Sequence, residues 1–237
     1  MIRRRLAVGA ASEQYYLSLD DYIDVDRLRS MNDGLEAKLL NLLEEEPERV
    51  GLFSAGERLD PNGSTQSGTR TVRLRNQFRG GYSEIHCGDS WEDSESVADF
   101  PELMRFVASL PLKSYGRCFI IFDDKGVIEL PHRDHGDPKL KQEFMWFRTN
   151  RKKRFYIYER SSGTKHYVES YSAWFDTRHF HGVDPADGLS LSVRVDGVFT
   201  DEFRNTVAAL QQGLVQPEGY SVWEKMIRRC QTKFGGG

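Results

Sequence analysis

Apolar and polar residues follow two different periods along this chain. In the first half, leucines recur at helical spacing over 34–46, and Pro47 ends the predicted helix. Apolar residues with the same period predict a second helix over 99–109, which ends before Pro111. The pattern therefore predicts an N-terminal region, 1–114, made of helices and loops.

Beyond this region the chain changes to short apolar stretches that are separated by turn residues. The predicted strands are 117–122, 127–130, 144–147, 154–159, 164–169, 173–175 and 189–199. Many short strands at this spacing favour an antiparallel sandwich or barrel over a parallel sheet. The final segment, 200–237, returns to a helical pattern. We expect one mainly β domain with flanking helices, whose β-core spans 115–199.

Composition narrows the classes of protein that fit this pattern. The 237 residues are 29% charged and 12% aromatic, with a formal net charge of −3, so a substantial folded core is expected and a generic polyanion binder is not. The three cysteines, Cys87, Cys118 and Cys230, form no CxxC pair, which excludes a disulfide framework and a structural zinc site. No apolar run approaches the roughly 20 residues of a membrane span. We expect a soluble, cytoplasmic protein with no membrane partner.

The histidines are clustered, and five of the six lie between positions 132 and 181. His132 and Asp134 are two residues apart, so in a strand they point to the same face and could bind one metal ion. His179 or His181 could supply a third ligand. Two imidazoles and one carboxylate form the facial triad of non-haem Fe(II) oxygenases, which leaves adjacent coordination positions open. His135 lies beside this motif, and its role stays open.

Arg194 lies within the alternating apolar strand 189–199, where an unpaired cation would be costly. A carboxylate partner removes that cost, because the guanidinium fork binds a carboxylate through two hydrogen bonds. The partner could be the carboxylate of a bound ligand. It could equally be an internal aspartate such as Asp196 or Asp176.

Together these residues resemble the Fe(II)/2-oxoglutarate-dependent oxygenases, whose fold is a double-stranded β-helix of the jelly-roll, cupin-like kind. The resemblance covers about 115–199 and looks most like the aspartyl/asparaginyl β-hydroxylase and proline hydroxylase branch. It implies that His132, Asp134 and His181 bind Fe(II). It also implies that Arg194 holds the distal carboxylate of 2-oxoglutarate.

Two assignments within the resemblance need a choice. His181 is preferred to His179 because the run His181-Gly-Val resembles the distal histidine of the family, and His179 is expected to pack nearby or to donate a hydrogen bond to a ligand. The second 2-oxoglutarate contact is open, because the Arg-x-His that the branch commonly carries is absent. Arg148 and Ser192 are the two candidates.

The expected function is that of a dioxygenase that uses Fe(II), 2-oxoglutarate and O2 to hydroxylate a small molecule, an amino acid or a natural product derived from one. The alternatives are the same chemistry on a peptide or protein side chain, a cupin-type metalloenzyme without 2-oxoglutarate, and a non-catalytic binding module. The Gly- and Ser-rich segment 54–81 is a candidate lid over such a site.

The densest basic run, 148–154, is followed by aromatic residues, a combination that can bind single-stranded nucleic acid. Relatives that repair alkylated bases carry a second arginine six residues after the first, and here that position is Thr200. We therefore interpret the run as a hairpin turn whose charges face solvent, and we expect no nucleic-acid partner.

Overall fold

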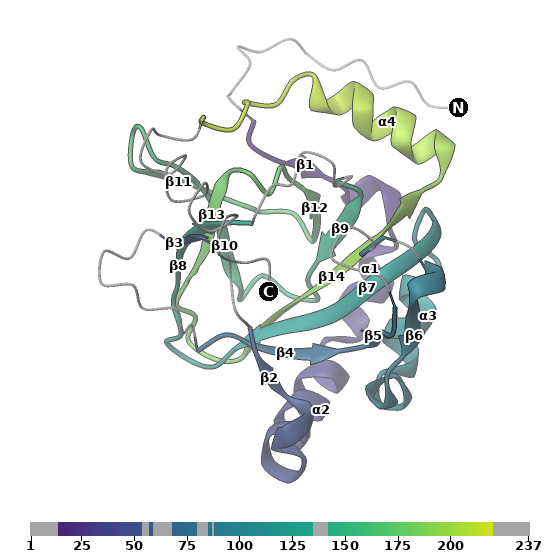
Figure 1. Cartoon of the computed structure of the whole chain (residues 1–237). Coiled ribbons are helices and arrows are strands. Elements are labelled where there is room, and N and C mark those ends of the chain that lie inside the picture. Colours follow the sequence, from purple (N-terminus) through teal and green to yellow (C-terminus); the bar gives the residue numbers. More distant parts are fainter. Residues whose placement is uncertain are drawn as a thin grey trace, which may run out of the picture.

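The centre of the molecule is a pair of antiparallel β-sheets (Figure 1). The computed structural model describes residues 14–53, 57–58, 68–79, 85–86, 88–134 and 142–219. The larger sheet has the order Leu17–Ser18 (β1), Ser172–Trp174 (β12), Phe144–Phe147 (β9), Ser190–Phe199 (β14), Leu112–Asp123 (β7), Arg70–Arg73 (β4) and Gly51–Leu52 (β2). The smaller sheet has the order Thr164–Tyr167 (β11), Arg154–Glu159 (β10), Phe180–Asp184 (β13), Glu129–Arg133 (β8) and Glu57–Arg58 (β3).

From β7 onward the strands follow the connectivity of a jelly roll. Strands β7, β9, β12 and β14 belong to the larger sheet, and β8, β10, β11 and β13 to the smaller one. The central pair is β7 and β14, which run antiparallel with Ser190 opposite Asp123 at one end and Phe199 opposite Leu112 at the other. The prediction of a mainly β chain with a jelly-roll core and flanking helices is confirmed, although the sheets do not close into a barrel.

Helices cover the outer face of the larger sheet (Figure 1). They are Val25–Ser30 (α1), Asn32–Glu45 (α2) and Pro101–Val107 (α3). The ring of Phe106 on α3 contacts Phe147 of β9 at 5.2 Å between centroids, which identifies the face that carries Phe147 as the one under the helices. The predicted helices 34–46 and 99–109 therefore correspond to α2 and α3, and their apolar residues join one core with this sheet.

A fourth helix, Asp201–Gln211 (α4), follows β14 directly. It begins where the side chain of Thr200 accepts a hydrogen bond from the backbone of Phe203. Phe203 then packs edge-on against Phe199 at 4.8 Å, which fixes the helix to the end of the strand. This part of the predicted C-terminal helical segment is confirmed, and 220–237 lies outside the described residues.

The sequence pattern missed several strands. Strands β1, β2 and β4 come from the region expected to be helical and looped, yet they complete the larger sheet. Two more, Arg75–Gln77 (β5) and Trp91–Asp93 (β6), form a separate two-stranded sheet. These segments are too short or too polar to alternate visibly, so their strand conformation depends on pairing with distant partners.

Some predicted features lie outside the described residues: half of the candidate lid 54–81, His135, Cys87 and Cys230. Of the cysteines, Cys118 is described and is buried with a free thiol. Within the described ranges, no helix combines the length and the apolar character that crossing a membrane requires.

Candidate metal centre

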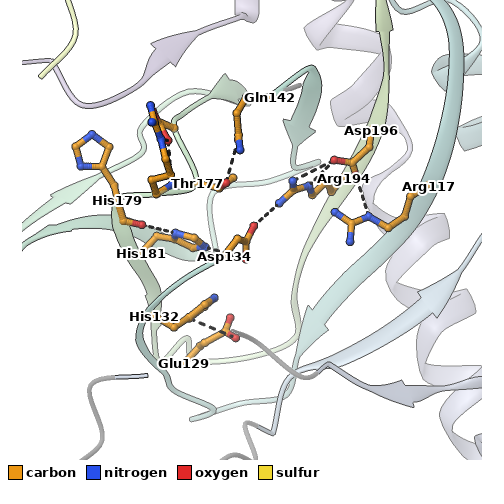
Figure 2. Close-up of polar contacts among 12 residues, drawn as sticks. Arg117, Glu129, His132, Asp134, Gln142, Thr177, His179, His181, Arg194 and Asp196 are labelled. Atoms are coloured by element: carbon orange, nitrogen blue, oxygen red, sulfur yellow. Dashed lines mark hydrogen bonds and ion pairs between the residues drawn. The ribbon is translucent and has the colours of Figure 1, made fainter. Parts of the chain in front are cut away.

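His132, Asp134 and His181 meet between the two sheets (Figure 2). Strand β8 carries His132, Asp134 follows the end of that strand, and β13 carries His181 directly opposite His132. One ligand atom from each residue lies within 4.8 Å of the others. The two imidazoles are 2% and 5% exposed and the side chain of Asp134 is 21% exposed, so the cluster is a site of the size that one metal ion needs, buried at its histidines and open to solvent at its carboxylate.

Backbone carbonyls orient both imidazoles. Nδ1 of His132 lies 3.0 Å from the carbonyl oxygen of Leu130, and Nδ1 of His181 lies 2.9 Å from that of His179. A carbonyl only accepts, so each Nδ1 is the protonated nitrogen and each Nε2 keeps its lone pair. Such a contact on the far side of the ring is typical of metal-ligating histidines.

The protonation states of the cluster also suit a metal ion. Burial and the neighbouring His132 together lower the pKa of His181 to about 3. Burial alone would raise the pKa of Asp134, but Arg194, the two histidines of the cluster and Arg117 together outweigh it and lower that pKa to about 2. At neutral pH His181 is therefore neutral and Asp134 ionised, which are the ligating forms.

His179 lies outside this cluster. Its Nε2 is 3.1 Å from the carbonyl oxygen of Val215, and its ring packs edge-on against Tyr15 at 5.8 Å. Residues 177–179 form a turn before β13, so His179 and His181 do not share a strand face. Its contribution to the cluster is the backbone carbonyl that accepts from His181 (Figure 2). Of the two expectations for His179, the side-chain hydrogen bond to a ligand is absent among the described residues, and the ring packs nearby, against Tyr15.

Arg194 connects the cluster to a second aspartate. Its Nη1 donates to Oδ2 of Asp134 at 3.0 Å, and its Nη2 donates to Oδ1 of Asp196 at 3.0 Å. Arg117 on β7 donates to the other oxygen of Asp196 at 2.7 Å. The internal ion pair with Asp196 is thus present, and Asp134 and Arg117 extend it into a chain of four charges (Figure 2).

The net charge of this network is compatible with a bound divalent ion together with a dicarboxylate. Burial would raise the pKa of Asp196, but Arg117 and Arg194 lower it, so Asp196 is ionised, as Asp134 is. The charges of the two arginines and the two aspartates therefore sum to zero. An ion of charge +2 together with a dianion such as 2-oxoglutarate keeps the site neutral. Oδ1 of Asp134 faces His181 Nε2 at 4.0 Å, while Oδ2 is held by Arg194. The residues therefore fit Fe(II) and its cosubstrate.

The two candidates for the second cosubstrate contact differ in their surroundings. Ser192 lies two residues from Arg194 on β14, so it points to the same face. Its hydroxyl is buried and makes no hydrogen bond within the described ranges. The guanidinium of Arg148, in contrast, donates to the backbone carbonyls of Lys153, Val168 and Ser170. None of these partners belongs to the metal cluster. The contacts of Arg148 therefore favour Ser192 as the candidate for the second cosubstrate contact.

The basic run 148–154 is not a solvated hairpin turn throughout. Arg148 and Lys153 are each only 2% exposed, and Lys153 forms a buried ion pair with Asp123. Lys152 pairs with Glu36 on α2 at 2.8 Å. The expectation that these charges face solvent is wrong for Arg148 and Lys153, because backbone carbonyls and a buried carboxylate compensate them.

His86 lies near the charge network of Asp196, Arg194 and Arg117. It is 8% exposed, and burial lowers its pKa, whereas the nearby charge of Asp196 raises it. The backbone of Ile85 next to it accepts a hydrogen bond from the amide of Arg117 at 2.8 Å, which places this segment against β7. No local signal marks His86, because only this packing brings it to the network.

Comparisons with known proteins give structural likeness only. No family model matches the sequence, and no curated protein matches it. Among solved structures, a prolyl-4-hydroxylase from Pseudomonas putida is 12% identical, with a TM-score of 0.42 over 77% of this chain and 91% of that chain. A Trichoplax adhaerens prolyl hydroxylase in complex with a hypoxia inducible factor peptide is 14% identical, with a TM-score of 0.45 over 82% and 87%.

A third solved structure, an oxidoreductase of the 2OG-Fe(II) oxygenase family from Burkholderia pseudomallei, is 12% identical, with a TM-score of 0.38 over 79% of this chain and 98% of that chain. These proteins come from the superfamily that the sequence motifs resemble.

Proposed function

We propose that this protein is an Fe(II)- and 2-oxoglutarate-dependent dioxygenase that hydroxylates a small molecule. The observation that carries the proposal is the convergence of His132, Asp134 and His181, with Arg194 against the carboxylate of Asp134. Two neutral imidazoles and one carboxylate on one side of an ion match the facial triad of non-haem iron oxygenases.

In the proposed reaction, 2-oxoglutarate, O2 and a substrate C–H bond give succinate, CO2 and the corresponding alcohol. Bound Fe(II) supplies the redox chemistry of this conversion. The chain holds Nε2 of His132, Nε2 of His181 and Oδ1 of Asp134 toward the ion, because carbonyls and Arg194 engage their other polar atoms. The two imidazoles are buried, which limits the access of water on their side of the site.

Arg194 is proposed to hold the distal carboxylate of 2-oxoglutarate, with Ser192 as the second contact. Its guanidinium is shared between Asp134 and Asp196. Arg117 also donates to Asp196, so that aspartate keeps a cationic partner when Arg194 turns toward the cosubstrate. The buried hydroxyl of Ser192 has no partner among the described residues, and a carboxylate oxygen would give it one.

One observation favours a second candidate function, a cupin-type metalloenzyme without 2-oxoglutarate. Two internal carboxylates already compensate Arg194, so no cosubstrate is needed to balance its charge. Metal binding is common to both candidates. Only the response to 2-oxoglutarate separates them.

Anaerobic titration tests the proposal. Addition of Fe(II) and then 2-oxoglutarate is expected to produce a metal-to-ligand charge-transfer absorption band. His132→Ala and Asp134→Ala should abolish the band, because each removes a ligand. Arg194→Ala should mainly weaken the binding of 2-oxoglutarate, by about tenfold or more, because a charge-assisted hydrogen bond is lost. His179→Ala is the matched control, since its ring lies outside the cluster, and it should keep the band.

The outcomes separate the candidates. A folded wild-type protein that binds Fe(II) but gives no band contradicts the dioxygenase proposal and supports the cupin-type enzyme. A protein that binds no Fe(II) contradicts both. Loss of iron binding in His179→Ala with retention in His181→Ala contradicts the ligand assignment.

A further inference from the structure

A cleft of about 660 Å³ opens on the inner face of the larger sheet, beside the charge network. Arg117, which donates to Asp196 of that network, forms part of its wall, together with Phe119. Phe53 and Trp91 add further aromatic surface. The cleft is thus lined by polar and aromatic side chains, and Asp196 connects its wall residue Arg117 to Arg194.

Strand register places the floor of the cleft on the same face as the metal centre. Arg73 of β4 lies opposite Phe119 of β7, and Phe119 lies opposite Arg194 of β14. Residues that are directly paired across neighbouring strands point to the same face. Strands are spaced about 4.8 Å apart, so the backbones of Arg73 and Arg194 are separated by roughly 10 Å across two strand spacings.

The charged residues that line the cleft are arginines, and the nearest carboxylates belong to the charge network and to an adjoining hollow that Arg73 also borders. Three arginines line it, and none of its described lining residues is an Asp or a Glu. Arg75 is engaged by backbone carbonyls and Asp93, and Arg117 by Asp196. The exposed guanidinium of Arg73, in contrast, makes no ion pair or hydrogen bond with another described residue.

A buried hydroxyl lies next to this arginine. Thr71 is two residues before Arg73 on β4, so its side chain points to the same face and also lines the cleft. It is 8% exposed, and its Oγ1 has no hydrogen-bond partner among the described residues. An unpartnered buried hydroxyl is costly unless a ligand completes it.

From this arrangement we propose that the cleft binds a carboxylate group of the substrate through Arg73 and Thr71. The guanidinium offers a fork of two N–H donors, and the hydroxyl donates a third hydrogen bond. The aromatic walls accommodate an apolar body that extends from the carboxylate toward Arg194. On the proposed function, the reacting carbon of the substrate lies at the end of this body near the metal centre. Only this last step rests on the proposed function.

Matched probes test the carboxylate site without iron or 2-oxoglutarate. Calorimetric titration of the full chain with 4-phenylbutyrate and with 4-phenylbutyramide compares an anion with a neutral molecule of the same shape. The acid should bind about five- to tenfold more tightly. Arg73→Gln should remove this preference, and Thr71→Val should reduce it. Arg105→Gln, an exposed arginine on α3 that pairs with Glu102, should retain it.

Equal affinity for the two probes, no detectable binding at millimolar concentration, or an unchanged preference in Arg73→Gln overturns the inference. The charge-transfer band of the iron complex should be the same in Arg73→Gln as in the wild type. A preference for the acid without such a band leaves the carboxylate site standing and rejects the dioxygenase. A charge-transfer band without the preference for the acid supports the dioxygenase and rejects the carboxylate site.

Discussion

At the scale of the residue, the imidazole of His181 couples the candidate metal centre to the stability of the chain. Its folded pKa is about 3, because burial and His132 disfavour the charged ring. An unfolded histidine titrates near 6.5. Between these values the unfolded state binds a proton that the folded state does not, so stability rises with pH in this window.

Acid is therefore expected to destabilise the metal-free protein through His181. Between pH 7 and pH 5 this residue should contribute a loss of up to about 2 kcal/mol in the free energy of unfolding. Urea denaturation in the presence of a chelator measures the loss. His181→Gln should lose correspondingly less over the same interval. The same pH dependence in variant and wild type would contradict this account.

At the scale of the element, strand β13 decides where the third ligand lies. Strands β9 and β10 have the bounds that the short apolar stretches in the sequence predicted, 144–147 and 154–159. Phe180–Asp184 was not predicted, because it is short and contains a glycine and no clear alternation. It becomes a strand because it pairs with β10 on one side and β8 on the other.

Gly182 in this strand allows its neighbours to approach closely. A Cβ at this position would lie 2.5 Å from the backbone oxygen of Glu129 and 2.6 Å from the hydroxyl of Tyr156. The backbone oxygen cannot rotate away, so β13 would have to shift relative to β8.

Gly182→Ala should therefore destabilise the protein by about 1–3 kcal/mol and weaken metal binding, because His181 moves with the strand. Urea denaturation and Fe(II) titration measure the two effects. Gly188→Ala, where a Cβ meets nothing within 4 Å, is the control and should change neither. An unaltered metal affinity in Gly182→Ala would show that β13 tolerates the shift.

At the scale of the whole molecule, a buried ion pair connects the two sheets away from the metal centre. Lys153 at the start of β10 binds Asp123 at the end of β7, and both side chains are 2–3% exposed. Ser190 of β14 lies 3.5 Å from the same carboxylate. The pair therefore fixes the beginning of β10, in the smaller sheet, to the central strands of the larger one.

Removal of one partner should cost more than removal of both. Lys153→Met leaves Asp123 buried without its cation and should reduce the free energy of unfolding by about 3–5 kcal/mol. The double variant with Asp123→Leu should recover most of that loss. A double-mutant cycle from urea denaturation measures the coupling, and two additive single losses would contradict it.

The sequence by itself determined the parts of this protein that depend on local pattern and on side-chain chemistry. Short apolar stretches between turn residues located most strands of the β-core, and the spacing of His132 and Asp134 indicated a metal site. Both signals are readable because each strand, and the His132-x-Asp134 motif, lies within one short segment. The helices α2 and α3 were predicted for the same reason.

Only the tertiary structure decided which distant residues meet. The turn before β13 separates His179 from His181, and strand pairing brings Arg117, Asp196 and Arg194 together. The same pairing recruits β1, β2 and β4 into the larger sheet and puts Arg73 on the face of the metal centre. These features arise from hydrogen bonds and packing between segments far apart in the chain, which local periodicity does not encode.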